Sequence, residues 1–155
     1  MRLSTKAQYA VRALIDLSLH SGGNPVSLRE ISQREDIPLN YLEQLFLRLR
    51  KGRIINSVRG PGGGYLLARS GRQITVSEIV ATVEEPLNPV SCLDEGGKRC
   101  HRGSRCVTHN VWKGLGENIR GFLDAISLED LTRQAQEGTD GTLPAKKKQA
   151  RRGEL

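Results

Sequence analysis

Residues 39–67, LNYLEQLFLRLRKGRIINSVRGPGGGYLL, contain the pattern that decides the fold. In the first half of this stretch apolar residues recur three and four positions apart, which predicts an amphipathic helix that ends near Lys51. Residues 54–58 and 65–67 lie on either side of a glycine-rich loop, and this pattern predicts two antiparallel strands. The stretch therefore predicts a helix followed directly by a β-hairpin.

The sequence before this stretch predicts two more helices. Residues 4–19 carry apolar side chains at helical spacing and are followed by the turn sequence SGGNP. Ser27 and Glu30 form a capping-box pattern, in which each side chain bonds the backbone of the other, and open a short second helix. The third helix starts either with Pro38 as its first residue or after a cap pair formed by Asn40 and Glu43. The order helix, helix, helix, hairpin is that of a winged helix-turn-helix, a mainly α fold with a small β-hairpin wing.

The sequence after the hairpin predicts three further helices. Thr75 and Glu78 form a second capping-box pattern, an irregular loop follows over residues 88–105, and Ser127 caps a last short helix. Between them a long helix starts near Val107 and carries one apolar row: Val111, Leu115, Ile119, Phe122 and Ile126. We expect this helix to pair with its copy in a homodimer through Val111, Leu115, Ile119 and Phe122. A core helix of a monomer is the alternative.

The charge distribution favours a polyanionic partner. The chain has 155 residues, of which 37% are hydrophobic and 4% aromatic, and a net charge of +7. Residues 1–70 carry eleven Lys/Arg against five Asp/Glu, residues 71–141 carry eight against eleven, and residues 142–155 carry five against one. The positive charge therefore belongs to the N-terminal half and the tail, where DNA is one candidate ligand and a solvated basic surface is the other.

Other features exclude several classes of protein. No apolar run reaches the length of a membrane span, and Arg12 and Asp16 interrupt the first apolar stretch, so we expect no membrane segment and no signal peptide. The three cysteines lie between positions 92 and 106, which favours a metal or redox site in a reducing cytoplasm over a disulfide framework. Asp, His and Ser residues form no recognisable nucleophilic arrangement, so we expect no enzyme activity.

The third helix has the side chains of a DNA-reading helix. Its polar side carries Asn40, Tyr41, Glu43, Gln44 and Arg48. The N-terminal residues of a recognition helix meet base edges in the major groove, where Gln can bond adenine and a carboxylate can accept from the cytosine amino group. An exposed amphipathic helix of any small α domain would look similar, so this helix alone favours DNA binding only weakly.

The glycine-rich loop strengthens the DNA interpretation. Arg59 precedes Gly60, Pro61 and Gly62 in a loop with four glycines. Glycine lets a backbone approach phosphate closely, and an arginine on a wing can enter the narrow minor groove. A nucleotide-phosphate loop is the competing interpretation, but no Lys-Ser/Thr follows the glycines and no helix begins there. We therefore expect a wing that contacts DNA.

Four potential metal ligands lie close together in the sequence: Cys92, Cys100, Cys106 and His109. Three thiolates and an imidazole suit either Zn²⁺ or an iron–sulfur cluster. The absence of paired Cys-x-x-Cys motifs favours the cluster over zinc, while His101 is a rival ligand. Unliganded surface thiols and an electron-transfer protein are further alternatives. Lys and Arg residues among these thiols favour the thiolate form, which binds metal.

The chain resembles the IscR-like family of bacterial winged-helix transcription regulators over roughly residues 1–135. The resemblance is densest at YLEQLF (41–46), RLRK (48–51) and SVRGPGGGYLL (57–67), and it resumes at CVTH (106–109), Trp112 and GFL (121–123). It implies a homodimer that holds one [2Fe–2S] cluster per subunit through Cys92, Cys100, Cys106 and His109. A related branch that senses nitric oxide with three cysteines and a [4Fe–4S] cluster fits less well, because His109 stands in the CVTH motif.

The resemblance also implies a function. The cluster-bound form would repress genes for cluster assembly, and the cluster-free form would bind a second class of operator. Tyr41, Gln44, Ser57 and Arg59 would contact double-stranded DNA, and Glu43 would discriminate between operator classes. A cluster-assembly scaffold would donate the cluster in the cytoplasm.

Three regions are therefore expected. Residues 1–70 form a winged helix-turn-helix DNA-binding region, and residues 71–136 form the cluster-binding loop with the dimerisation helices. Residues 137–155 turn to Gly, Thr, Pro, Lys and Arg, and we expect a basic, disordered tail.

Overall fold

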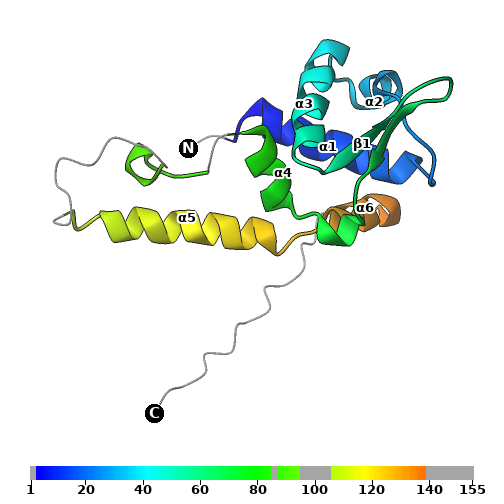
Figure 1. Ribbon diagram of the computed structural model, residues 1–155. Coiled ribbons are helices and arrows are strands. Elements are labelled where there is room, and N and C mark those ends of the chain that lie inside the picture. Colours follow the sequence, from blue (N-terminus) through cyan, green and yellow to red (C-terminus); the bar gives the residue numbers. More distant parts are fainter. Residues whose placement is uncertain (1–2, 85–86, 95–105, 139–155) are drawn as a thin grey trace.

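The computed structural model describes residues 3–84, 87–94 and 106–138. This part of the chain forms helices and one antiparallel hairpin (Figure 1). The elements are α1 Thr5–His20, α2 Leu28–Glu35, α3 Leu39–Lys51, β1 Ile55–Val58, β2 Gly64–Leu67, η1 Gly71–Gln73, α4 Val76–Val83, η2 Ser91–Leu93, α5 His109–Asp124 and α6 Leu128–Glu137. The predicted mainly α fold with a small hairpin wing is confirmed. The expected tail lies almost wholly outside the described residues.

Short polar side chains fix where the helices begin. Ser27 Oγ accepts from the N–H of Glu30 at 3.3 Å, and the Glu30 carboxylate accepts from the N–H of Ser27 at 3.0 Å, so this predicted capping box is confirmed. Thr75 caps α4 by accepting from the N–H of Glu78. The Glu78 carboxylate, however, pairs with Arg69 instead of returning to the helix start. Only half of the second predicted box is therefore formed.

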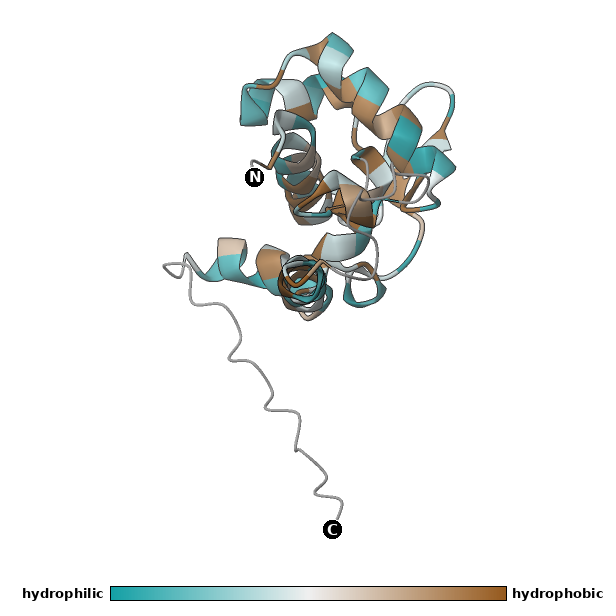
Figure 2. Cartoon of the chain, turned by 90° about the vertical axis from the view of Figure 1, so that its left-hand side faces the viewer, coloured by the Kyte–Doolittle hydropathy of each residue, from teal (hydrophilic) through white to brown (hydrophobic). Residues whose placement is uncertain are grey.

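The hydrophobic core surrounds α1. This helix contacts α2, α3, α4, α6 and β2, and its alanines let the neighbouring helices approach closely. Figure 2 shows apolar and polar residues alternating along the helices, as expected of amphipathic helices packed around one core. Fully buried side chains come from both sides of residue 70: Leu14, Leu17, Ile31, Leu42, Phe46, Leu49, Ile55, Ile79, Val83 and Leu128. The hydrophobic core thus crosses the expected boundary between residues 1–70 and residues 71–136. The assignment of DNA binding to the first region and of cluster binding and dimerisation to the second stays a prediction.

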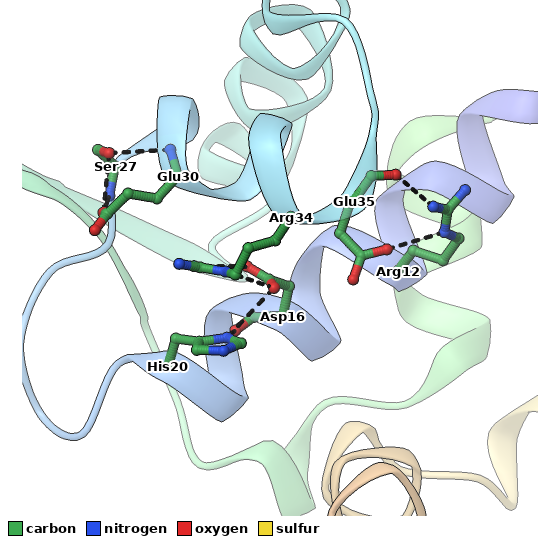
Figure 3. Close-up of polar contacts among 7 residues, drawn as sticks. All are labelled: Arg12, Asp16, His20, Ser27, Glu30, Arg34 and Glu35. Atoms are coloured by element: carbon green, nitrogen blue, oxygen red, sulfur yellow. Dashed lines mark hydrogen bonds and ion pairs between the residues drawn. The ribbon is translucent and has the colours of Figure 1, made fainter.

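An ion pair between the buried Asp16 and the more exposed Arg34 joins α1 to α2. Asp16 is 3% exposed and accepts from both Nε and Nη2 of Arg34 at 2.9 Å (Figure 3). His20 Nδ1 lies 3.3 Å from the same carboxylate. Hydrogen bonding to Asp16 raises the pKa of Arg34 above its ordinary value. Because α2 and α3 form the helix-turn-helix, this pair helps to orient that unit on α1.

The hairpin is held against the start of α2. Its strands pair from Ile55 opposite Leu67 to Val58 opposite Gly64. Tyr65 also exchanges two backbone hydrogen bonds with Val26, at 2.8 and 3.0 Å. A Cβ at position 64 would lie 2.3 Å from the carbonyl oxygen of Val26, so glycine is required there for the close approach. The base of the wing is therefore fixed to the helical core.

Two details after α4 differ from the sequence-based expectation. Ile126 was expected on the long helix, but α5 ends at Asp124, and Ile126 is 5% exposed with its carbonyl accepting from Val76 at 2.9 Å. Ile126 thus belongs to the core because the turn after α5 returns the chain to α4. The segment expected to be irregular contains the short helix η2 in its described part. No helix within the described ranges combines the length and apolarity needed to cross a membrane.

Candidate DNA interface and metal centre

The exposed side of α3 presents most of the predicted DNA-reading residues. Asn40, Glu43 and Gln44 are exposed on its first turns, while the opposite side is buried through Leu42, Leu45, Phe46 and Leu49. Pro38 precedes the helix and fixes the backbone at its start. This arrangement leaves amide and carboxylate groups, the types that bond base edges, at the N-terminal end of α3, which is the end that a recognition helix directs at the bases.

Tyr41 is only partly available to a ligand. It is half-buried, and its ring packs edge-on against the ring of Tyr9 with centroids 5.6 Å apart. Arg12 lies over the Tyr9 ring at 5.5 Å and also pairs with Glu35 at 3.1 Å. Tyr41 therefore ties α3 to α1, and its predicted contact with DNA stays a prediction.

Arg48 is engaged within the protein. Its Nη1 donates to the carbonyl oxygen of Val83 at 2.7 Å. The last carbonyls of a helix lack partners inside the helix, and a cation near them is favoured by the helix dipole. In this structure the guanidinium therefore stabilises the C-terminal end of α4, while the predicted contact of Arg48 with DNA stays untested.

The wing exposes all of its predicted DNA contacts: Ser57, Arg59, Gly60, Pro61 and Gly62. Gly60 and Gly62 have φ values of 98° and 72°, in the left-handed region that favours glycine. Arg50 Nη1 lies 3.4 Å from Ser57 Oγ and so joins the end of α3 to β1. The sequence interpretation missed Arg50, although the basic run 48–51 directly before the hairpin is a signal that could have found it.

The structure brings two of the predicted metal ligands together. His109 is the first residue of α5, and its N–H donates to the carbonyl of Cys106 at 3.2 Å, so both lie in one turn. Both side chains are half-buried, and the Cys106 sulfur lies 3.3 Å from Thr108 Oγ1. Cys92 is half-buried in η2. Two thiols and an imidazole are donors that suit iron as well as zinc.

The full ligand set is not assembled in the described part of the chain. Cys100 and the rival ligand His101 lie outside the described residues. Among those that are described, no group of three His, Cys, Asp or Glu side chains is placed to hold a metal ion. The chemistry of the donors fits the expected group, whereas the convergence of Cys92 with Cys106 and His109 stays a prediction.

The predicted dimerisation residues form an apolar row on α5. Val111 is 60% exposed, Leu115 41% and Phe122 42%, while Ile119 is half-buried. Large apolar side chains are rarely left in a contiguous row on a monomer. Figure 1 shows α5 along the lower edge of the molecule, and dimerisation through this row stays a prediction.

Three features define a winged-helix DNA-binding regulator: a helix-turn-helix with a docked wing, an exposed polar side on α3, and an apolar row on a separate helix. Residues 3–134 match the Rrf2 family, described as "Iron-dependent Transcriptional regulator". The chain therefore belongs to the Rrf2 family and is a transcription regulator.

Relatives with known names support this membership. The chain is 50% identical over 131 residues to the HTH-type transcriptional regulator IscR of Photorhabdus laumondii, which covers 84% of this chain and 79% of that protein. It is 47% identical over 131 residues to IscR of Escherichia coli O1:K1 / APEC, covering 84% and 80%. These relatives are named as transcriptional regulators, in line with the expectation of a non-enzyme.

Solved structures share the fold. IscR of T. potens has 37% sequence identity and a TM-score of 0.71, over 92% of this chain and 93% of that one. CymR, the global cysteine regulator of B. subtilis, has 30% identity and a TM-score of 0.72, over 90% of this chain and 99% of that one. The winged-helix prediction is thereby confirmed.

Proposed function

We propose that this regulator senses the supply of iron–sulfur clusters through a [2Fe–2S] cluster held by Cys92, Cys100, Cys106 and His109. The observation that carries the proposal is the shared turn of Cys106 and His109 at the start of α5, the helix with the exposed apolar row. A ligand site at that point can influence how two subunits meet. The names of the IscR relatives point the same way.

The start of α5 suits a group with negative charge. Hydroxyl side chains cap α1, α2, α4 and α6, but Thr108 makes no side-chain cap bond at α5. The first N–H groups of a helix favour anions, and a cluster bound by three thiolates brings negative charge. Cys106 and His109 would be two of the ligands that hold such a cluster at this helix end, and the protein would lose the cluster when iron or sulfur is scarce.

The proposed regulator acts as a homodimer. Val111, Leu115 and Phe122 of one subunit would pack against the same residues of a second copy, since a two-fold interface is self-complementary. Sedimentation at micromolar concentration should show a dimer, and Leu115→Asp should give a monomer. A monomeric wild-type protein would contradict this part of the proposal.

In the proposed function, the cluster changes which DNA the protein prefers. With cluster bound, the dimer represses cluster-assembly genes, and without it the dimer binds a second class of operator. Asn40, Glu43 and Gln44 read bases from α3, while Ser57, Arg59 and the Gly60–Gly62 turn hold the wing on the DNA. A cluster-assembly scaffold in the cytoplasm is the proposed cluster donor.

Metal analysis of anaerobically purified protein tests the ligand set. Wild-type protein should be coloured and contain equal amounts of iron and sulfide, and Cys92→Ala, Cys106→Ala and His109→Ala should each lower both. His101→Ala is the matched control and should keep the cluster. A colourless wild-type protein with stoichiometric zinc would contradict the cluster and establish a structural zinc site. Loss of the cluster in His101→Ala but not in His109→Ala would reassign the fourth ligand.

A further inference from the structure

One asparagine links helix α5 with the turn that contains Cys92. Asn88 Nδ2 donates to the carbonyl oxygen of Leu93 at 3.1 Å and to Asp94 Oδ1 at 2.9 Å. On its other side, Asn88 Oδ1 accepts from Arg120 Nη1 at 3.2 Å. The amide has a single orientation that satisfies all three partners, because only its nitrogen can donate and only its oxygen can accept. The Asn88 side chain therefore bonds residues at the end of helix η2 and is itself bonded to Arg120 of α5.

A second contact holds the same segment on the same helix. Pro89 lies against Gly116, where a Cβ would be 3.2 Å from Pro89 Cδ. Gly116 is buried in the middle of α5. Figure 1 shows the green turn of η2 beside the N-terminal half of this helix. The absence of a side chain at position 116 thus lets the proline ring pack directly on α5, the helix that begins with His109.

We propose that Asn88 is the positioning residue for Cys92, and that it fixes the Cys92 thiol along α5 before any cluster binds. The inference rests on the proposed function, in which Cys106 and His109 provide ligands at the start of the same helix. A site assembled from separate segments binds more tightly when those segments are already ordered, because less conformational freedom is lost on binding. Asn88 supplies that order through bonds to its own turn and to Arg120.

Substitutions can remove the contacts of the Asn88 amide nitrogen and those of its oxygen one at a time. Asn88→Asp keeps an acceptor for Arg120 but has no donor for Leu93 and repels Asp94, so it should open the turn while leaving the link to α5. Arg120→Met should do the opposite, because it removes the hydrogen bond between an intact turn and α5 while the contact of Pro89 with Gly116 remains. Asn118→Asp is the matched control, because Asn118 is an exposed residue of α5 whose side chain donates to the carbonyl of Gly114 in its own helix.

The experiment uses cluster-free, full-length protein and limited alkylation by iodoacetamide. Peptide mass spectrometry gives the modification rate of Cys92 relative to Cys106, which serves as internal reference. Asn88→Asp and Arg120→Met each remove a hydrogen bond that holds the turn containing Cys92. The modification ratio should therefore rise about three- to tenfold in each variant. The ratio should stay at the wild-type value in Asn118→Asp. An unchanged ratio in folded Asn88→Asp and Arg120→Met would overturn the proposal.

A second readout links the position of the thiol to the cluster. Reconstituted Asn88→Asp should lose its visible absorbance to a chelator faster than wild-type protein, by a factor similar to the change in thiol reactivity. A changed thiol ratio with an unchanged rate of loss would also overturn the proposal. If wild-type protein takes up no cluster, the proposed function fails, and the alkylation ratio still decides whether Asn88 positions Cys92.

Discussion

The guanidinium of Arg48 on α3 donates a 2.7 Å hydrogen bond to the carbonyl oxygen of Val83 at the C-terminal end of α4. Near this bond Gly52 meets α4 so closely that a Cβ would lie 2.5 Å from Thr82 Cγ2. The N–H of Ser4 donates to Glu84 at 3.0 Å at the same helix end. Helix α3 is thus joined to the end of α4, from which the chain leads toward Cys92.

Arg48→Met should lower stability more than it lowers DNA affinity. The variant keeps the aliphatic stem but leaves the Val83 carbonyl without its donor, at a cost of about 1 kcal/mol. That cost corresponds to a decrease in Tm of about 3 °C. Thermal unfolding and DNA binding over a range of salt concentrations check the prediction. A wild-type Tm combined with a reduced salt dependence would show that Arg48 binds phosphate instead.

Arg59→Ala should lower DNA affinity without lowering thermal stability. Arg59 is exposed on the wing, so its loss should leave Tm unchanged. Binding should weaken for every DNA sequence, and the slope of log affinity against log salt should fall by about one. Arg133→Ala on α6, where Arg133 pairs with Asp130 at 3.1 Å, is the control and should keep the wild-type slope. Equal slopes for all three proteins would mean that the wing does not touch DNA.

Glu43→Gln should change which DNA is preferred. A carboxylate near phosphates is repelled unless it accepts from a base amino group, so its replacement removes both the repulsion and the discrimination. Binding to operators with single base-pair changes should show a shift of about 1–3 kcal/mol at one position. Glu137→Gln, with the same change of charge at the end of α6, should keep the wild-type order of operators. The prediction fails if both variants rank the panel alike.

Complete capping boxes open α2, through Ser27 and Glu30, and α6, through Ser127 and Asp130, and both should make stability fall in acid. Backbone hydrogen bonds from Ser27 and Ser127 lower the pKa of Glu30 and Asp130 from their ordinary values of 4.5 and 3.8. Groups with a lowered pKa stabilise the folded state above the unfolded-state pKa, and this contribution is lost as pH falls through the folded-state pKa. Thermal melts should show Asp130→Asn less stable than wild type at pH 6. The difference should shrink below about pH 4, and a constant difference down to pH 2 would contradict the assignment.

Local patterns made most of the fold predictable. The caps at Ser27 and Ser127, the amphipathic spacing of α3 and the glycine-rich turn act over a few residues, so the sequence displays them directly. Ile126 was placed on the wrong element because its spacing continues the apolar row of α5, and only the packing against α4 shows where the helix ends.

Contacts between distant segments could not be predicted in this way. Arg48 has the type and spacing of a DNA contact, and its bond to Val83 joins residues 35 positions apart. Arg120 and Asn88 are 32 positions apart, and neither was singled out by the sequence pattern. The exposed residues Asn40, Glu43 and Gln44 were found because helical periodicity alone separates them from the buried side.

If the cluster decides which DNA the protein binds, selection from a randomised duplex library should reveal the change of preference. Anaerobic cluster-bound protein and the same preparation after cluster removal would each select DNA at one salt concentration. Two different consensus sites should be selected, each with two half-sites related by two-fold symmetry. A single consensus bound with equal affinity by both forms would contradict this role of the cluster.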